Sequence, residues 1–131
     1  MIKQYEKYEG REDNLQIAAA RFLDILGVHW LHIANERHTS PQRGAKLKKM
    51  GVKSGACDIF ILEPRGDYHG LFIELKVKGG RLSDNQKEFI DKSNERNYKT
   101  VVCWSIDELI DTVEDYLKSK KPLFCEGFKT Q

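Results

Sequence analysis

Three charged residues stand on two expected β-strands with a spacing that suits phosphate chemistry. Asp58 lies in the apolar run 57–62, and Glu74 follows it sixteen residues later, with Lys76 two positions on, in the apolar run 71–77. Side chains alternate between the two faces of a strand, so Glu74 and Lys76 point to the same face. Two carboxylates and an ammonium group at one place suit a divalent cation and an anionic substrate.

The segment between the two runs, residues 63–70, contains proline, glycine and aspartate, which favour turns. It predicts a β-hairpin that folds Asp58 back beside Glu74 and Lys76. An amphipathic hairpin with a solvated face, on which these charges are surface residues, is the simpler alternative. Phe72 shares the face of Glu74 and Lys76, and Phe60 shares that of Asp58, which favours a charged cluster set into a covered sheet.

Apolar periodicity and helix-capping signals predict the elements that must position these residues. Ser83 followed by Gln86, and Ser105 followed by Glu108, have the spacing of capping boxes that open helices. The expected elements are a helix at 12–26, a strand at 28–34, a basic connection at 36–56 with a short helix around 45–50, strands at 57–62 and 71–77, a helix at 84–94, a strand at 98–104 and a helix at 106–118. This order predicts an α/β fold with a mixed sheet flanked by helices.

Length and composition predict an ordinary globular protein. The 131 residues suit a single domain over 1–131, with a core at about 10–118 and a loosely held tail at 119–131. No apolar run approaches membrane-spanning length, and the N-terminal residues do not have the pattern of a signal peptide. Three cysteines without a CxxC motif indicate reduced thiols of a cytosolic protein, with no disulfide framework or zinc site.

The net charge of +2 is small, but the basic residues are unevenly distributed. No Asp or Glu occurs between positions 37 and 57, whereas six basic residues do: Arg37, Arg43, Lys46, Lys48, Lys49 and Lys53. A local basic segment on a nearly neutral protein predicts a surface for a polyanion such as DNA. A solvated loop explains the same charges equally well.

Five short motifs, in this order, resemble the virus-type replication-repair nuclease (VRR-NUC) domain of the PD-(D/E)xK nuclease superfamily. They are Glu12 to Gln16, Asn35-Glu36, Gly51 to Asp58, Glu74-Leu75-Lys76 and Ser83 to Gln86. The resemblance covers roughly residues 10–105 and implies the superfamily core, αβββαβ. One departure is Cys57, which stands where the superfamily has proline; that position shapes the backbone and does no chemistry.

The resemblance also implies roles for individual residues. Asp58 and Glu74 would bind Mg²⁺ or Mn²⁺, assisted by the main-chain carbonyl of Leu75 and by Glu12 as an additional ligand. Lys76 would stay charged beside these carboxylates and orient the attacking water or stabilise the phosphorane. Without the resemblance, the preferred interpretation of Glu12 is an acid in the first turn of a helix, where the helix dipole favours it.

Three polar residues complete the site that the resemblance implies. Gln16 lies one turn after Glu12 on the same helix face and would position site groups, as would Asn35 at the end of the first strand. Gln86 borders the catalytic residues in the family, although its place in a capping box explains it without any catalytic role.

The resemblance therefore implies a metal-dependent endonuclease that cleaves branched DNA, with four-way (Holliday) junctions as the expected substrate. Stand-alone members of the family look like symmetric junction resolvases, so we expect a homodimer whose two sites make the two opposed cuts. Because these members are largely encoded by phages or prophages, we expect the protein in the cytoplasm of a bacterial host cell. Large residues available for a dimer interface are Trp30, Tyr116, Leu123, Phe124 and Phe128. The alternatives are a DNA-binding module without catalysis and a nuclease of the restriction or flap type.

Overall fold

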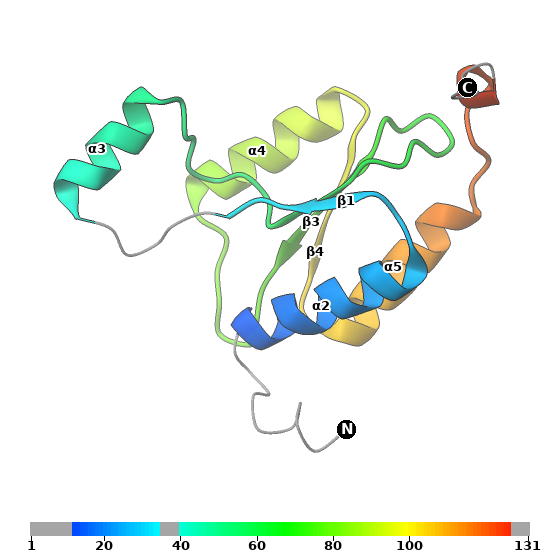
Figure 1. Cartoon of the computed structure of the whole chain (residues 1–131), viewed down its shortest axis with the longest axis horizontal. Helices are drawn as coiled ribbons and strands as arrows, with labels where there is room; N and C mark the ends of the chain where they lie inside the picture. Colours follow the sequence, from blue (N-terminus) through cyan, green and yellow to red (C-terminus); the bar gives the residue numbers. More distant parts are fainter. Residues whose placement is uncertain (1–11, 35–39, 127–131) are drawn as a thin grey trace.

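A four-stranded mixed sheet forms the centre of the protein, and helices cover both of its faces (Figure 1). The computed structural model describes residues 12–34 and 40–126. In chain order the elements are α2 (Glu12–Leu26), β1 (Trp30–His32), α3 (Pro41–Lys49), β2 (Ile59–Ile61), β3 (Leu71–Leu75), α4 (Asp84–Glu95), β4 (Lys99–Cys103), α5 (Ile106–Lys118) and α6 (Leu123–Glu126). The predicted α/β fold with a mixed sheet is confirmed.

The strands lie in the order β1-β2-β3-β4, so sequence neighbours are also neighbours in the sheet. β1 pairs antiparallel with β2, and β2 pairs antiparallel with β3. β4 then joins parallel to β3, with Leu75 opposite Cys103, because α4 carries the chain back between these two strands. The two central strands, β2 and β3, are those on which the charged residues were predicted.

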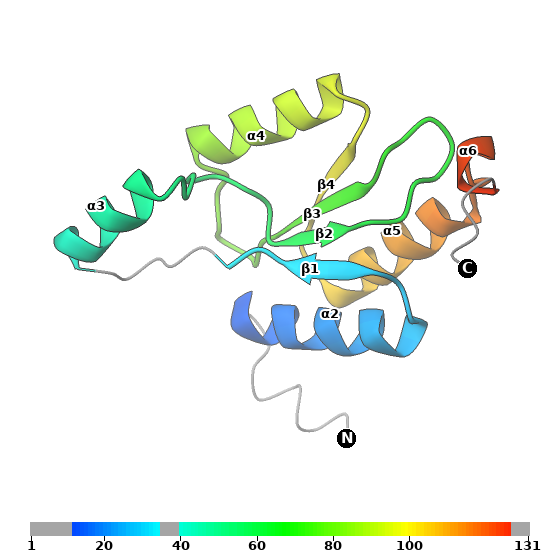
Figure 2. The same cartoon turned by 45° about the horizontal axis from the view of Figure 1, so that its top comes forward.

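One face of the sheet carries the main apolar core, which α2 and α5 cover (Figure 2). Apolar residues that are buried in this layer come from the two helices and from β2, β3 and β4: Ala19, Leu23, Ile59, Ile61, Leu71, Ile73, Leu75, Cys103, Leu109, Val113 and Tyr116. Alternation along β3 therefore sends its aliphatic side chains to this layer, and the intervening residues to the opposite face.

The opposite face of the sheet is aromatic and lies under α4. The rings of Phe60 and Phe72 stack across β2 and β3 with their centroids 4.4 Å apart. Phe89 of α4 meets Phe72 edge-on at 5.1 Å. Such pairs contribute about 0.5–1.5 kcal/mol beyond the area that they bury. Because helix and rings cover this face, charged residues that follow Phe72 on it are shielded from water.

The predicted helix boundaries mostly agree with the structure, the strands are shorter than predicted, and the basic connection differs. The predicted helix around residues 45–50 begins four residues earlier, at Pro41. Ser40 is its N-cap, because its hydroxyl accepts a hydrogen bond from the backbone N–H of Arg43 at 3.2 Å. Serine before proline is a helix-start signal, so the sequence did contain this boundary. The tail also forms the four-residue helix α6.

The second predicted capping box is only half present. Ser105 Oγ accepts a hydrogen bond from the backbone N–H of Glu108 at 3.1 Å, as predicted. The Glu108 carboxylate, however, accepts from the backbone N–H of Trp104 at 2.7 Å. The second hydrogen bond of the box is thus made to the residue before the N-cap, and not to the N-cap itself.

Of the large residues proposed for an interface, two are engaged within the domain. Tyr116 is buried and its hydroxyl donates to the carbonyl oxygen of Glu63 at 2.6 Å, so it belongs to the core and its assignment to an interface is wrong. The indole of Trp30 donates to Asp24 at 2.9 Å. Exposed apolar side chains are Leu123 and Phe124, and Phe128 lies outside the described residues. No helix in the described ranges is long and apolar enough to cross a membrane.

Candidate active site

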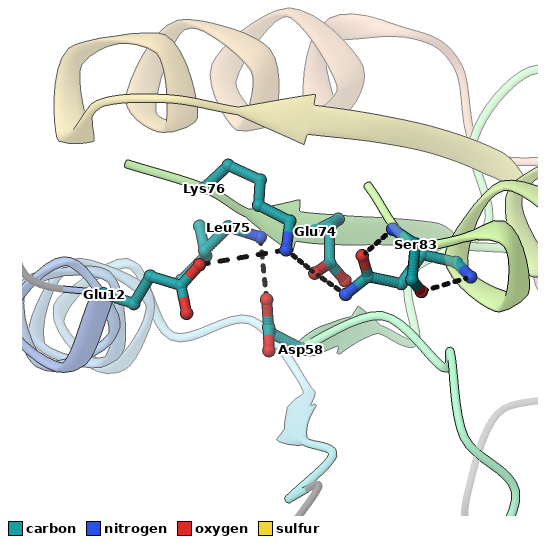
Figure 3. Close-up of polar contacts among 7 residues, drawn as sticks. Glu12, Asp58, Glu74, Leu75, Lys76 and Ser83 are labelled. Atoms are coloured by element: carbon teal, nitrogen blue, oxygen red, sulfur yellow. Dashed lines mark hydrogen bonds and ion pairs between the residues drawn. The ribbon is translucent and has the colours of Figure 1, made fainter. Parts of the chain in front are cut away.

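The hairpin register places Asp58 opposite Glu74. Ile59 of β2 pairs with Ile73 of β3, and continuing this antiparallel register by one residue brings the two acids together. Asp58 Oδ2 accepts a hydrogen bond from the backbone N–H of Leu75 at 2.8 Å (Figure 3). The carboxylate thereby takes a place in the ladder between the two strands. The expectation that the hairpin brings Asp58 beside Glu74 is confirmed.

Glu74 and Lys76 are buried, with only 1% and 5% of their surfaces exposed. Lys76 Nζ lies 3.8 Å from Glu74 Oε1 and 3.9 Å from Glu12 Oε1. Both distances exceed hydrogen-bond length, so the ammonium group lies between two carboxylates as their shared counter-ion (Figure 3). Buried charges persist in proteins only when they are paired, so the solvated-face interpretation of this hairpin is wrong.

Gln86 belongs both to the capping box of α4 and to the charged cluster. Its side-chain oxygen accepts from the backbone N–H of Ser83 at 2.8 Å, and Ser83 Oγ accepts from the backbone N–H of Gln86 at 3.1 Å. Its Nε2 group donates to Glu74 Oε1 at 2.8 Å. The capping box is therefore confirmed, and a different atom of the same side chain contacts Glu74; a catalytic role for Gln86 stays a prediction.

Two helices begin at the charged cluster. Glu12 is the first residue of α2, and Gln86 lies in the first turn of α4. Helix N-termini carry a partial positive charge and free N–H groups, which favour carboxylates and phosphates. Both helix ends thus help to balance the acids of the cluster and favour an anionic ligand beside it.

Of the remaining residues predicted for the site, the structure describes Gln16 but not Asn35 or Arg37. Gln16 is half-buried on α2, one turn after Glu12. Its Oε1 atom is buried and has no hydrogen-bond partner among the described residues. Asn35 and Arg37 lie outside the described residues.

The other predicted DNA-binding residues lie on or just after α3. Arg43, Lys46, Lys48 and Lys49 are exposed on this helix, which buries none of its residues, and Lys53 is exposed beyond it. In both views α3 stands away from the sheet, at the end of the molecule where α2 and α4 begin (Figures 1 and 2). The basic segment is thus an exposed cationic helix at the same end as the charged cluster.

A close contact holds the end of this basic segment against α4. Asn85 Nδ2 donates to Ser54 Oγ at 2.6 Å. Gly55 has φ +93°, and a Cβ atom there would lie 2.5 Å from the backbone of Asn85. Asn85 was not predicted as a site residue, because its partner is 31 residues away along the chain. Lys78 and Arg81 were not predicted either; both are exposed cations in the loop between β3 and α4, soon after Lys76.

A cysteine stands directly before Asp58 in the sequence. Cys57 is fully buried; burial raises the pKa of its thiol, and the charges of Glu74 and Asp58 raise it further. A raised pKa disfavours the thiolate, which is the nucleophilic form of cysteine. Cys57 and Cys103 are both free and buried, which agrees with the expectation of reduced thiols.

The donors of the cluster fit a small, hard cation. Within the part of the chain that the structure describes, no three His, Cys, Asp or Glu side chains converge as a complete metal cage. Mg²⁺ does not require such a cage, because it keeps several waters and binds to one or two carboxylates together with substrate phosphate. Asp58 and Glu74, which face each other across β2 and β3, supply such a pair.

Comparison with known proteins identifies the family of this chain. Residues 11–107 match the family model described as the VRR-NUC domain. A solved structure described as "VRR_NUC domain protein" is 31% identical in sequence; the match covers 84% of this chain and 90% of that chain, with a TM-score of 0.67. No curated protein matches the chain. Because this family model spans most of its residues and a solved structure of the same description is 31% identical over most of both chains, the chain belongs to the VRR-NUC family of PD-(D/E)xK-type nucleases.

Proposed function

We propose that this nuclease is a metal-dependent endonuclease that hydrolyses phosphodiester bonds in branched DNA, with the four-way junction as its preferred substrate. The observation that carries the catalytic part is the buried cluster in which Lys76 lies between Glu74 and Glu12, beside Asp58. Burying these charges costs free energy, and a fold seldom keeps such a cluster at the open ends of two helices without a use for it.

Asp58 and Glu74 would hold Mg²⁺ or Mn²⁺, with the Leu75 carbonyl and Glu12 as further oxygen donors. Bound there, the ion supplies activation of water and neutralises charge on the phosphate. The hydrogen bond from Gln86 Nε2 fixes the orientation of the Glu74 carboxylate. Replacing a residue that hydrogen-bonds to a metal ligand in this way typically lowers metal affinity or activity by about 10–100-fold.

Lys76 would act on the reacting phosphate. Its backbone N–H donates to the carbonyl of Cys103 at 3.0 Å, so the residue is anchored where β3 ends. Its ammonium group, held by Glu12 and Glu74, can orient the attacking water and stabilise the negative charge that develops on phosphate oxygens. Gln16, with its buried acceptor, and Asn35 would position groups around it.

The cations of α3, together with Lys53 and Arg37, would bind the DNA backbone and bring a phosphate to the cluster. Contacts of this kind position DNA and do not read its sequence. Replacing Lys46, Lys48 and Lys49 together by alanine should weaken binding to all sequences and reduce its salt dependence by about 1 unit of slope for each lost contact. An unchanged slope would show that α3 is only a solvated helix.

Resolving a four-way junction needs two opposed cuts, whereas one chain offers one cluster. A two-fold homodimer would place two sites on a substrate of matching symmetry. Leu123 and Phe124, which are 84% and 58% exposed, offer apolar surface for such an association. Light scattering should then give about twice the chain mass of 15.2 kDa. A monomer that cuts flaps as readily as junctions would contradict both the dimer and the substrate.

The decisive assay incubates the protein with four-way junction, flap and linear duplex DNA in Mg²⁺, Mn²⁺ or EDTA. Asp58→Asn and Glu74→Gln should each abolish cleavage and leave DNA binding, and Lys76→Ala should slow turnover strongly. Asp91→Asn removes an exposed carboxylate of α4 and should change nothing. Turnover of Asp58→Asn or Glu74→Gln at the level of Asp91→Asn would refute the assignment. Binding without cleavage by the unmodified chain would favour the alternative, a DNA-binding module.

A further inference from the structure

The basic helix α3 ends in an exposed apolar tip formed by Met50 and Val52. Met50 is 71% exposed and Val52 is 46% exposed, although both are apolar. Exposed lysines lie on either side of this tip, at Lys48 and Lys49 before it and at Lys53 after it. A flexible, polarisable methionine side chain is thus exposed on a segment that also exposes lysines before and after it.

The backbone of this tip is held rigidly. Val52 N–H donates to the carbonyl of Leu47 at 3.0 Å, and Gly51 N–H donates to the carbonyl of Lys48 at 3.1 Å. Gly51 has φ +98°, the left-handed conformation that this helix ending requires. The two bonds and the glycine form a Schellman motif, which fixes Met50 and Val52 beyond the helix. Local backbone hydrogen bonds therefore define the conformation in which Met50 and Val52 are exposed.

The tip is also linked closely to the charged cluster. Two residues after Val52, Ser54 accepts a hydrogen bond from Asn85, and Gly55 packs against the backbone of Asn85. The residue that follows Asn85 is Gln86, which donates to Glu74. This chain of contacts connects the segment that carries the tip to the charged cluster through Asn85 and Gln86.

We propose that Met50, supported by Val52, is a wedge that inserts between DNA bases at a branch point while the lysines of α3 bind the flanking phosphates. This inference rests on the proposed cleavage of branched DNA and names the element that selects the branch. Cations surrounding an apolar tip match a nucleic acid, whose charged backbone borders flat, apolar bases. Proteins insert methionine and other apolar side chains between base steps in this way.

A wedge of this kind explains a preference for branched DNA by energy alone. Inserting a side chain requires that two stacked bases separate, and this costs least where stacking is already interrupted. A four-way junction or flap offers such a step at its branch, whereas a continuous duplex does not. The tip would thus stabilise the complex with branched DNA and contribute little to duplex binding, which the lysines supply in both cases.

The test measures the fluorescence of 2-aminopurine placed at the branch point of a four-way junction, in EDTA and with saturating protein. Unstacking raises this fluorescence, so the unmodified protein should increase it, and Met50→Ala should remove at least about half of the increase. Met50→Leu, which retains an apolar wedge, should restore it. Ile25→Ala is the matched control, because Ile25 is 87% exposed at the end of α2 away from Glu12.

A second measurement separates this inference from the proposed function. Met50→Ala should lower the ratio of junction to linear-duplex cleavage by roughly 10-fold, while Lys48→Ala should weaken binding to both DNAs equally. If Met50→Ala loses the fluorescence increase but the unmodified protein cleaves no DNA, the wedge is supported and the nuclease activity is rejected. Full fluorescence and an unchanged ratio would overturn the wedge. Tighter binding to anionic phospholipid vesicles than to junctions, lost in Met50→Ala, would also overturn it.

Discussion

Replacing Gln86 by glutamate separates its two structural roles. The oxygen that accepts from Ser83 N–H would be retained, so the capping box could still form. The Nε2 group that donates to Glu74 at 2.8 Å would become a carboxylate oxygen, which puts two negative charges in contact. Glu74 is 1% exposed, and Lys76 is already shared with Glu12, so neither water nor that ammonium group offsets the new charge fully.

The expected cost can be estimated from this geometry. Two unit charges about 4 Å apart at an effective dielectric constant of about 20 repel by about 4 kcal/mol. The pair can escape by taking up one proton. An unfolded glutamate has a pKa of about 4.3, so forcing that proton on at pH 7 costs about 4 kcal/mol and at pH 5 about 1 kcal/mol. Gln86→Glu should therefore destabilise the fold by up to about 4 kcal/mol at pH 7 and about 1 kcal/mol at pH 5.

Urea unfolding of the unmodified chain and the variant at both pH values, in EDTA, measures this difference. EDTA is required because a divalent cation would neutralise the carboxylates. Gln86→Met is the matched control: it removes both hydrogen bonds without adding charge and should cost about 1–2 kcal/mol equally at both pH values. If Gln86→Glu destabilises the protein equally at pH 5 and pH 7, the contact between Gln86 and Glu74 is refuted.

Three further outcomes follow from the structure. Gly55→Ala should destabilise the fold by several times the roughly 1 kcal/mol expected for Gly51→Ala. Both glycines have positive φ, but of the two only Gly55 has backbone atoms within 4 Å of the added Cβ atom. Equal losses of stability in urea unfolding would contradict this. Burial raises the pKa of Cys57, so its thiolate fraction at pH 8 should be far below that of an exposed cysteine; rapid alkylation of the native protein, followed by mass spectrometry, would disprove it. Burial raises the pKa of Tyr116 to about 12, so stability should fall as pH rises from about 10, where unfolded tyrosine ionises, through about 12; Tyr116→Phe should lose this dependence in pH-dependent unfolding.

Local patterns in the sequence predicted most of the elements. Helix α2 was predicted at both ends because its apolar spacing runs to Leu26 and Gly27 stops it. The capping box from Ser83 to Gln86 was also correct, since both of its partners lie within one turn. The strands were predicted too long, and for β2 the reason is physical: Asp58 bonds to Leu75 through its carboxylate, so regular strand pairing begins after it.

The sequence by itself determined which residues could do chemistry. An aspartate on one strand and a glutamate and a lysine on the next, at this spacing, can be placed together in few ways. Only the tertiary structure decided that Lys76 lies buried between Glu74 and Glu12, since packing of α2 and α4 against the sheet sets those distances. It also decided that one side chain, Gln86, caps α4 and holds Glu74. The rigid, exposed tip of α3 was likewise beyond pattern analysis, because exposure depends on what the rest of the chain leaves uncovered.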